Sequence, residues 1–175
     1  MLQAFRTVFT PPTDPPPDPD RSREAVDRIN HAAAETAAAQ LARGEPFDLQ
    51  PLRRDCLAAI RDAAPAELPD LLGTLAAIKL LSARPADLDH AEELLRQSLA
   101  LRDETGDAAG AAADRLNLAW RDRLRGRLSA ATAHLNAARE LARSAGEPEL
   151  AARADDAIEE VRRVGDARRR MTHWN

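Results

Sequence analysis

The stretch "LNLAWRDRLRGRLSAATAHLNAARELARSAG", Leu116 to Gly146, decides the fold of this chain. On both sides of Gly126 apolar residues recur every three or four positions, which places them on one face of a helix. Gly126 and Gly146 interrupt this spacing, and glycine commonly ends helices because it enters left-handed turns without strain. The stretch therefore predicts two amphipathic helices joined by a tight turn.

The composition extends this prediction to the whole chain of 175 residues. Hydrophobic residues make up 44 % of the sequence, but aromatic residues only 3 %, and Ala and Leu carry most of the apolar content. Ala, Leu, Arg and Glu are strong helix formers, and runs of β-branched residues typical of strands are missing. We expect an all-α protein that is large enough to bury one core.

Charge and cysteine content narrow the classes of function. The formal net charge is −4, so no overall positive field attracts nucleic acid or an anionic membrane. The single cysteine, Cys56, excludes an internal disulfide and fits a reducing compartment. Because neither a membrane-spanning run nor a secretory signal is recognisable, we expect a cytoplasmic protein with no nucleic-acid and no membrane partner.

Helix breakers recur about every twenty residues after residue 20. They are Gly44 with Pro46, Pro65, Pro85, Gly106, Gly126, Gly146 and Gly165. Between them the pattern predicts seven helices, at 22–43, 47–63, 66–83, 87–105, 108–125, 128–145 and 148–167. Short connections between helices of similar length make antiparallel neighbours.

The sequence also repeats with a period of 40 residues, or two helices. Shifting it by this distance places Ala91 on Ala131 and Leu95 on Leu135. A repeat of two helices at such a period is typical of an array of helical hairpins. Because a short array exposes an apolar end unless it is capped, self-association into a homo-oligomer is also possible.

The positions of small and large apolar residues resemble the tetratricopeptide repeat (TPR) family. Leu118-Ala119 stands in place of the Leu-Gly pair of the first helix, and Ala131, Leu135 and Ala138 follow at the spacing of the second helix. In that family small residues let the two helices approach closely, and the large residue fills the gap between repeats.

The resemblance implies a fold and a function. It implies antiparallel hairpins stacked as a short right-handed array over residues 66–146, with a capping helix at 147–170. The helical pair that the spacing of breakers predicts at 21–65 precedes this array and matches no repeat motif. The family implies a non-enzymatic adaptor or scaffold that binds a protein or peptide in a groove lined by its first helices, without a cofactor.

Three residues are candidates for that groove. Asn117 matches a position where the family often places Asn to bond a peptide backbone; Arg121 lies one turn further on, and Lys79 lies in the matching region of the preceding pair. Together they would form a basic edge for an acidic partner. The alternative is that Asn117 and Arg121 are ordinary solvated surface.

The two ends of the chain offer a different mode of binding. Residues 1–20 combine a short amphipathic segment, which contains Phe5 and Phe9, with the Pro/Asp-rich stretch "TPPTDPPPDPD". The tail at 171–175 contains Trp174, and a large ring there suggests a docking element. As an alternative to groove binding, the chain would be a helical subunit or substrate of a larger enzyme or regulatory assembly that acts through these tails.

The candidates for chemistry are few. "DLDHAEE", Asp87 to Glu93, could hold a divalent ion in a metal-dependent helical enzyme, but the spacing of Asp89 and Glu92 favours helix capping and we predict no metal site. Cys56 lies on an apolar stripe, which predicts burial rather than reactivity.

Trp120 lies between Leu116 and Leu124 on another apolar stripe, so we expect it to pack in the core rather than to form a stacking platform.

Overall fold

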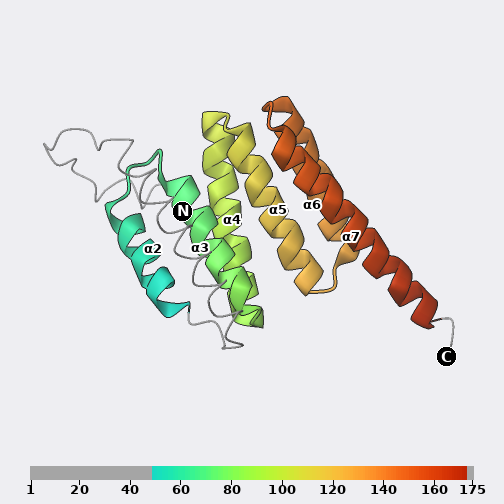
Figure 1. The fold of residues 1–175 in the computed structure, drawn as a ribbon. Coiled ribbons are helices and arrows are strands. Elements are labelled where there is room, and N and C mark those ends of the chain that lie inside the picture. Colours follow the sequence, from blue (N-terminus) through green and yellow to red (C-terminus); the bar gives the residue numbers. More distant parts are fainter. Residues whose placement is uncertain (1–48, 173–175) are drawn as a thin grey trace, which may run out of the picture.

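The computed structural model describes residues 49–172, which form helices joined by short turns. Figure 1 shows these helices side by side, from α2 at one end to α7 at the other. The all-α class is therefore confirmed for this part of the chain. Their bounds are α2 Gln50–Asp62, α3 Leu68–Ser82, α4 Pro85–Thr105, α5 Ala108–Leu124, α6 Leu128–Ser144 and α7 Pro148–Thr172.

Helices α2 to α6 begin and end within three residues of the predicted bounds. The predicted helix at 22–43 lies outside the described residues. Three of the predicted breakers form the same turn: Gly106, Gly126 and Gly146 have φ angles of 70°, 72° and 76°, which favour glycine. In each turn the N–H after the glycine donates to the carbonyl five residues earlier, which closes the preceding helix. These bonds join Asp107 to Arg102, Arg127 to Asp122 and Glu147 to Ala142.

Gly165, which the sequence places among the helix breakers, does not end a helix: α7 continues through it to Thr172, beyond the predicted end at residue 167. A glycine inside a helix costs about 1 kcal/mol relative to alanine but does not stop the helix. Here α7 keeps its packing on α6: a Cβ at residue 165 would lie 3.7 Å from Leu128 Cδ1. Tertiary contact therefore overrides the local breaker.

The helices pack in two layers. Consecutive helices contact each other, as the short turns require, and α3, α5 and α7 also contact one another in series. Since two successive reversals restore the chain direction, α3, α5 and α7 run the same way. The surface between these alternate helices is where a groove can form.

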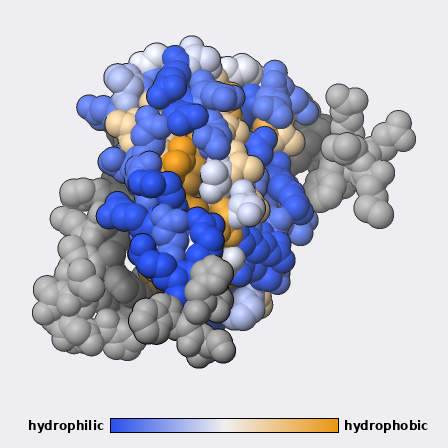
Figure 2. All heavy atoms as spheres, turned by 90° about the vertical axis from the view of Figure 1, so that its right-hand side faces the viewer, coloured by the Kyte–Doolittle hydropathy of each residue, from blue (hydrophilic) through white to orange (hydrophobic). Residues whose placement is uncertain are grey.

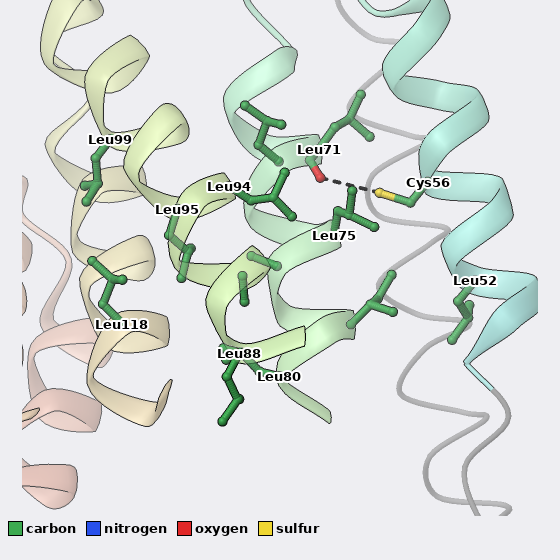
Figure 3. Packing of buried hydrophobic residues seen from close by; sticks show 14 of the residues in the cluster. Leu52, Cys56, Leu71, Leu75, Leu80, Leu88, Leu94, Leu95, Leu99 and Leu118 are labelled. Atoms are coloured by element: carbon green, nitrogen blue, oxygen red, sulfur yellow. Dashed lines mark hydrogen bonds between the residues drawn. The ribbon is translucent and has the colours of Figure 1, made fainter. Parts of the chain in front are cut away.

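Helices α2 to α5 enclose a core made mainly of leucine (Figure 3). Helix α3 lies at its centre and is apolar on nearly every side, so most of its residues are buried. Cys56 on α2 is fully buried in this cluster, as predicted, and its Sγ donates to the carbonyl of Leu71 at 3.4 Å. Burial raises the pKa of the Cys56 thiol to about 11, so it stays protonated and unreactive at neutral pH.

Helices α5 to α7 are held together by smaller side chains. Ala131 and Ala138 are fully buried, and Ala119 and Leu135 are 3 % and 2 % exposed. These are positions at which the repeat pattern predicts close approach, and their burial is confirmed. Alanine lets helices approach closely but fills little volume, so space remains at the surface where these three helices meet.

Helix α7 presents a charged surface on its outer side. Figure 2 shows the face of the molecule on the α7 side, where hydrophilic side chains predominate and apolar atoms form a narrow strip between them. The exposed residues of α7 include Asp156, Glu159, Arg162 and Arg163. In the part of the chain that the structure describes, no helix combines the length and apolarity needed to cross a membrane.

Candidate binding hollow between helices α5 and α7

A hollow of about 340 Å³ lies where α5, α6 and α7 meet. Its apolar walls come from all three helices, and its polar residues lie on α5 and α7 alone. Pockets that bind ligands typically combine apolar walls with a few polar groups. The lining residues are Leu116, Asn117, Ala119, Trp120 and Arg123 of α5, Leu135 of α6, and Arg153, Ala157, Glu160 and Val161 of α7.

The two ends of this α5–α7 hollow differ. At one end Arg123 Nη1 donates to Glu160 Oε1 at 2.5 Å, so an internal ion pair occupies the rim. Because α5 and α7 run in the same direction, six or seven residues earlier on each helix lie Asn117 and Arg153. Neither side chain makes a hydrogen bond or ion pair with the described residues. This end therefore offers an amide and a guanidinium that are free to bind a ligand.

Trp120 contacts the core with one part of its side chain and borders the hollow with another. The side chain is half-buried and packs against the leucine-rich core, as predicted from its apolar stripe. It also lines the α5–α7 hollow. An aromatic ring in this position supplies apolar contact area at a low cost in side-chain entropy.

Of the three predicted groove residues, only Asn117 lines the hollow. Lys79 is 4 % exposed, and its Nζ donates to Asp87 Oδ1 at 3.2 Å. Arg121 is also 4 % exposed and pairs with Glu92 and with Asp122, whose Oδ1 lies 2.6 Å from its Nη1. The expectation of an open basic edge is wrong for Lys79 and Arg121, and the alternative of solvated surface is wrong for Arg121, since both side chains are buried in internal ion pairs.

The acidic cluster on α4 has a structural role. The Asp87 carboxylate accepts from Ser82 Oγ at 2.8 Å, and this bond, with Lys79 nearby, lowers the pKa of Asp87. The predicted capping pair Asp89 and Glu92 is wrong, because α4 begins at Pro85. Instead Glu92 pairs with Arg121 of α5, and Asp89 pairs with Arg125, the residue that follows α5. Within residues 49–172 no group of three His, Cys, Asp or Glu could hold a metal ion.

Arg153, Ala157 and Val161 were missed as lining residues by the sequence reasoning. The signal that could have found them is the spacing of α7, where residues 153, 157, 160 and 161 follow one helical face. The predicted tail residues Phe5, Phe9 and Trp174 lie outside the described residues, as do residues 1–20 and most of the tail at 171–175.

No protein-family model, no curated protein and no solved structure matches this chain. The function therefore has to be argued from the α5–α7 hollow and its surroundings.

Proposed function

We propose that this chain is a non-enzymatic adaptor, built as a TPR-like helical array, that binds a segment of a protein partner in the α5–α7 hollow. The observation that carries the proposal is the hollow itself, with apolar walls from three helices and two unpaired polar side chains at one end. Helix-lined apolar grooves are a recurrent site for peptide segments.

Equivalent burial at the two copies of the repeat supports the array. Ala91 and Ala131 are both fully buried, and Leu95 and Leu135 are 0 % and 2 % exposed, although the members of each pair are 40 residues apart. The same environment at the same spacing is what stacked hairpins require.

The chemistry of the hollow favours a particular partner. The apolar walls around Trp120 and Val161 would take an apolar side chain, and Arg153 would pair with a carboxylate next to it. Asn117 can both donate to and accept from a peptide backbone. The partner we propose is therefore an acidic segment with an apolar anchor. An acidic partner was also expected from the sequence, but the guanidinium that would bind it is that of Arg153 rather than Arg121.

Peptide selection on the full-length protein tests this proposal. A displayed library of random peptides is selected on the immobilised chain, and the affinities of the enriched peptides are measured by fluorescence anisotropy. Ala157→Trp fills the hollow, and Ala157→Leu fills it more gently in case the larger ring disturbs folding. Ala152→Trp is the matched control, because Ala152 is exposed on α7 and does not line the hollow.

We expect both Ala157 variants to weaken binding at least about tenfold, which corresponds to ~1.4 kcal/mol, and the control to leave it unchanged. Asn117→Ala should weaken binding more than Asn136→Ala, since Asn136 does not line the hollow. If the folded Ala157→Leu protein binds every enriched peptide as tightly as the unmodified protein, the hollow is not the binding site.

A further inference from the structure

A second hollow lies at the end of the molecule where the α3–α4 and α5–α6 turns meet. It has a volume of about 370 Å³, and we call it the turn hollow. Arg125 holds the two turns together, since its Nη2 donates to the carbonyl of Pro85 at 2.9 Å and to Asp89 Oδ1 at 2.5 Å. The lining residues are Ala83, Pro85, Leu88, Leu124, Arg125 and Arg127.

The floor of the turn hollow is apolar and partly uncovered. Leu88 is buried, but Leu124 is 40 % exposed and belongs to the few large apolar side chains that the described part of the chain leaves open to solvent. A partly exposed leucine in the lining of a hollow offers a contact for an apolar group of a ligand.

The rim of the turn hollow carries unneutralised positive charge. Arg84 and Arg127 are exposed, and their side chains make no ion pair with the described residues. Arg168 lies close by, because its Nη1 donates to the carbonyl of Gly126 at 3.4 Å, and it too has no carboxylate partner among those residues. The nearby carboxylates of Asp87 and Asp89 are already paired with Lys79, Arg121 and Arg125.

One segment of this chain has the complementary chemistry. Residues 10–20, "TPPTDPPPDPD", contain three aspartates, six prolines and no basic residue. Proline rings offer apolar surface, and a proline-rich backbone loses little conformational entropy on binding. Aspartates between prolines therefore present carboxylates and apolar rings along one short segment.

We propose that residues 10–20 bind the turn hollow of the same chain, with prolines against Leu124 and aspartates at Arg84 and Arg127. Exposed ion pairs of this kind contribute little each, about 0.2–1 kcal/mol. Attachment to the same chain compensates for this weakness, because a tethered segment has an effective concentration that reaches the millimolar range when its tether spans the two sites.

The tether is long enough. Residues 21–48 separate the segment from the first described residue. Even if 22–43 is helical, as the sequence predicts, the tether spans roughly 50 Å at 1.5 Å per helical residue and about 3.3 Å per extended one. For comparison, α7 is the longest helix of the described residues; it has 25 residues and a length of about 38 Å by the same rise.

Paramagnetic broadening in the full-length protein tests the proposal. A nitroxide is attached to Pro16→Cys, and the methyl signals of Leu124 and Leu88 are compared with those of Leu57 on α2; Cys56 is fully buried and does not take the label. We expect selective broadening at Leu124 and Leu88. Arg84→Glu combined with Arg127→Glu should abolish it, whereas the matched pair Arg54→Glu with Arg61→Glu on α2 should not.

Other outcomes would overturn the proposal. Unbroadened Leu124 signals, or broadening of Val161 and Leu135 in the α5–α7 hollow instead, would show that residues 10–20 do not bind here. Broadening that appears only between differently labelled molecules would assign the contact to a second copy. If the broadening of Leu124 and Leu88 persists when the salt concentration rises from about 0.05 M to 0.5 M, the ion pairs do not hold the segment. The α5–α7 hollow is a separate site, so its own test is unaffected.

Discussion

The contact between α3 and α5 and the contact between α5 and α7 occupy equivalent places in the fold but are filled differently. Both join alternate helices of the same layer. Between α3 and α5 the helices meet closely at Gly73, where an added Cβ would lie 2.8 Å from Asp114 Oδ1. Between α5 and α7 the structure leaves a hollow of about 340 Å³. The first contact is sealed and the second is open.

Buried charge seals the first contact. Arg102 of α4 is 6 % exposed, and its Nε donates to Asp114 Oδ2 at 2.9 Å while its Nη2 donates to Asp70 Oδ1 at 2.6 Å. Ser98 Oγ donates to Asp114 Oδ2 at 2.5 Å, and Arg102 also pairs with Asp107. Burial raises the pKa of Asp114 even though Ser98 and Arg102 act in the opposite direction.

The second contact has an exposed ion pair instead. Arg123 and Glu160 are 36 % and 54 % exposed, so water screens their attraction. Equivalent contacts between alternate helices therefore differ: one is closely packed around buried charge, and the other leaves a hollow. Which of the two forms depends on a few side chains at each junction.

The difference between the two contacts is tested most directly by removing the arginine from each of them. Arg102→Met leaves Asp114 buried without its cation, and we expect a loss of about 3–5 kcal/mol in the free energy of unfolding. Arg123→Met should lower the free energy of unfolding by less than about 1 kcal/mol. Urea unfolding measures both, and equal losses would show that the two contacts do not differ as described.

The loss in Arg102→Met should also depend on pH. A carboxyl group whose pKa in the folded state is raised above the unfolded value near 3.8 contributes stability below that value, and this contribution is lost as the pH rises through the folded-state pKa. Asp114 without Arg102 is such a group. The gap between the variant and the unmodified protein should therefore narrow as the pH falls from 7 toward about 4.

Truncation of the repeat-equivalent leucines compares the packing of the two regions. Leu95→Ala should cost about 3–5 kcal/mol, because Leu95 lies inside the leucine-rich core. Leu135 is almost as well buried but borders the α5–α7 hollow, so Leu135→Ala should cost nearer 2–3 kcal/mol. Thermal and urea unfolding of the two variants would contradict this if Leu135→Ala proved the more damaging.

Two glycines within helices provide a second test of the difference in packing, with smaller expected changes in stability. Gly73→Ala forces a methyl group against Asp114, so the free energy of unfolding should fall by about 1–3 kcal/mol. Gly165→Ala on α7 meets only ordinary contact with Leu128 at 3.7 Å, so the better helix propensity of alanine should stabilise the protein by about 0.5–1 kcal/mol. A shift of the melting temperature in the same direction for both variants would contradict the proposed difference in packing.

The smallest expected effect concerns His134 on α6, near Asp122 and Arg115. Burial lowers its pKa below 6.5 despite the attraction of Asp122. The stability it contributes is therefore present above pH 6.5 and lost as the pH falls through the lowered value. His134→Gln should flatten the decline of the melting temperature between about pH 7 and 5. The pKa of His90 is lowered by burial as well, so His90→Gln should flatten the decline in the same way. A variant that leaves the decline unchanged would contradict the role of its histidine.

Local sequence predicted most of the fold. The spacing of Gly106, Gly126 and Gly146 located three turns because each glycine takes up a left-handed φ that its own position requires. The prediction failed at Gly165, where packing against α6 decides the outcome. It also failed for Lys79 and Arg121, because each pairs with a carboxylate of α4, Asp87 or Glu92, and no local pattern indicates a pairing between helices.

The sequence by itself determined the helices, their turns and the small residues at which they approach, since these follow from backbone preferences and from the spacing of apolar side chains along one chain. Only the tertiary structure decided which charges are buried and which remain free. Arg121 and Arg153 are both arginines on amphipathic helices, yet the first is enclosed by Glu92 and Asp122 and the second borders a hollow. The difference lies in what the neighbouring helices place opposite each guanidinium, and that depends on contacts across the fold.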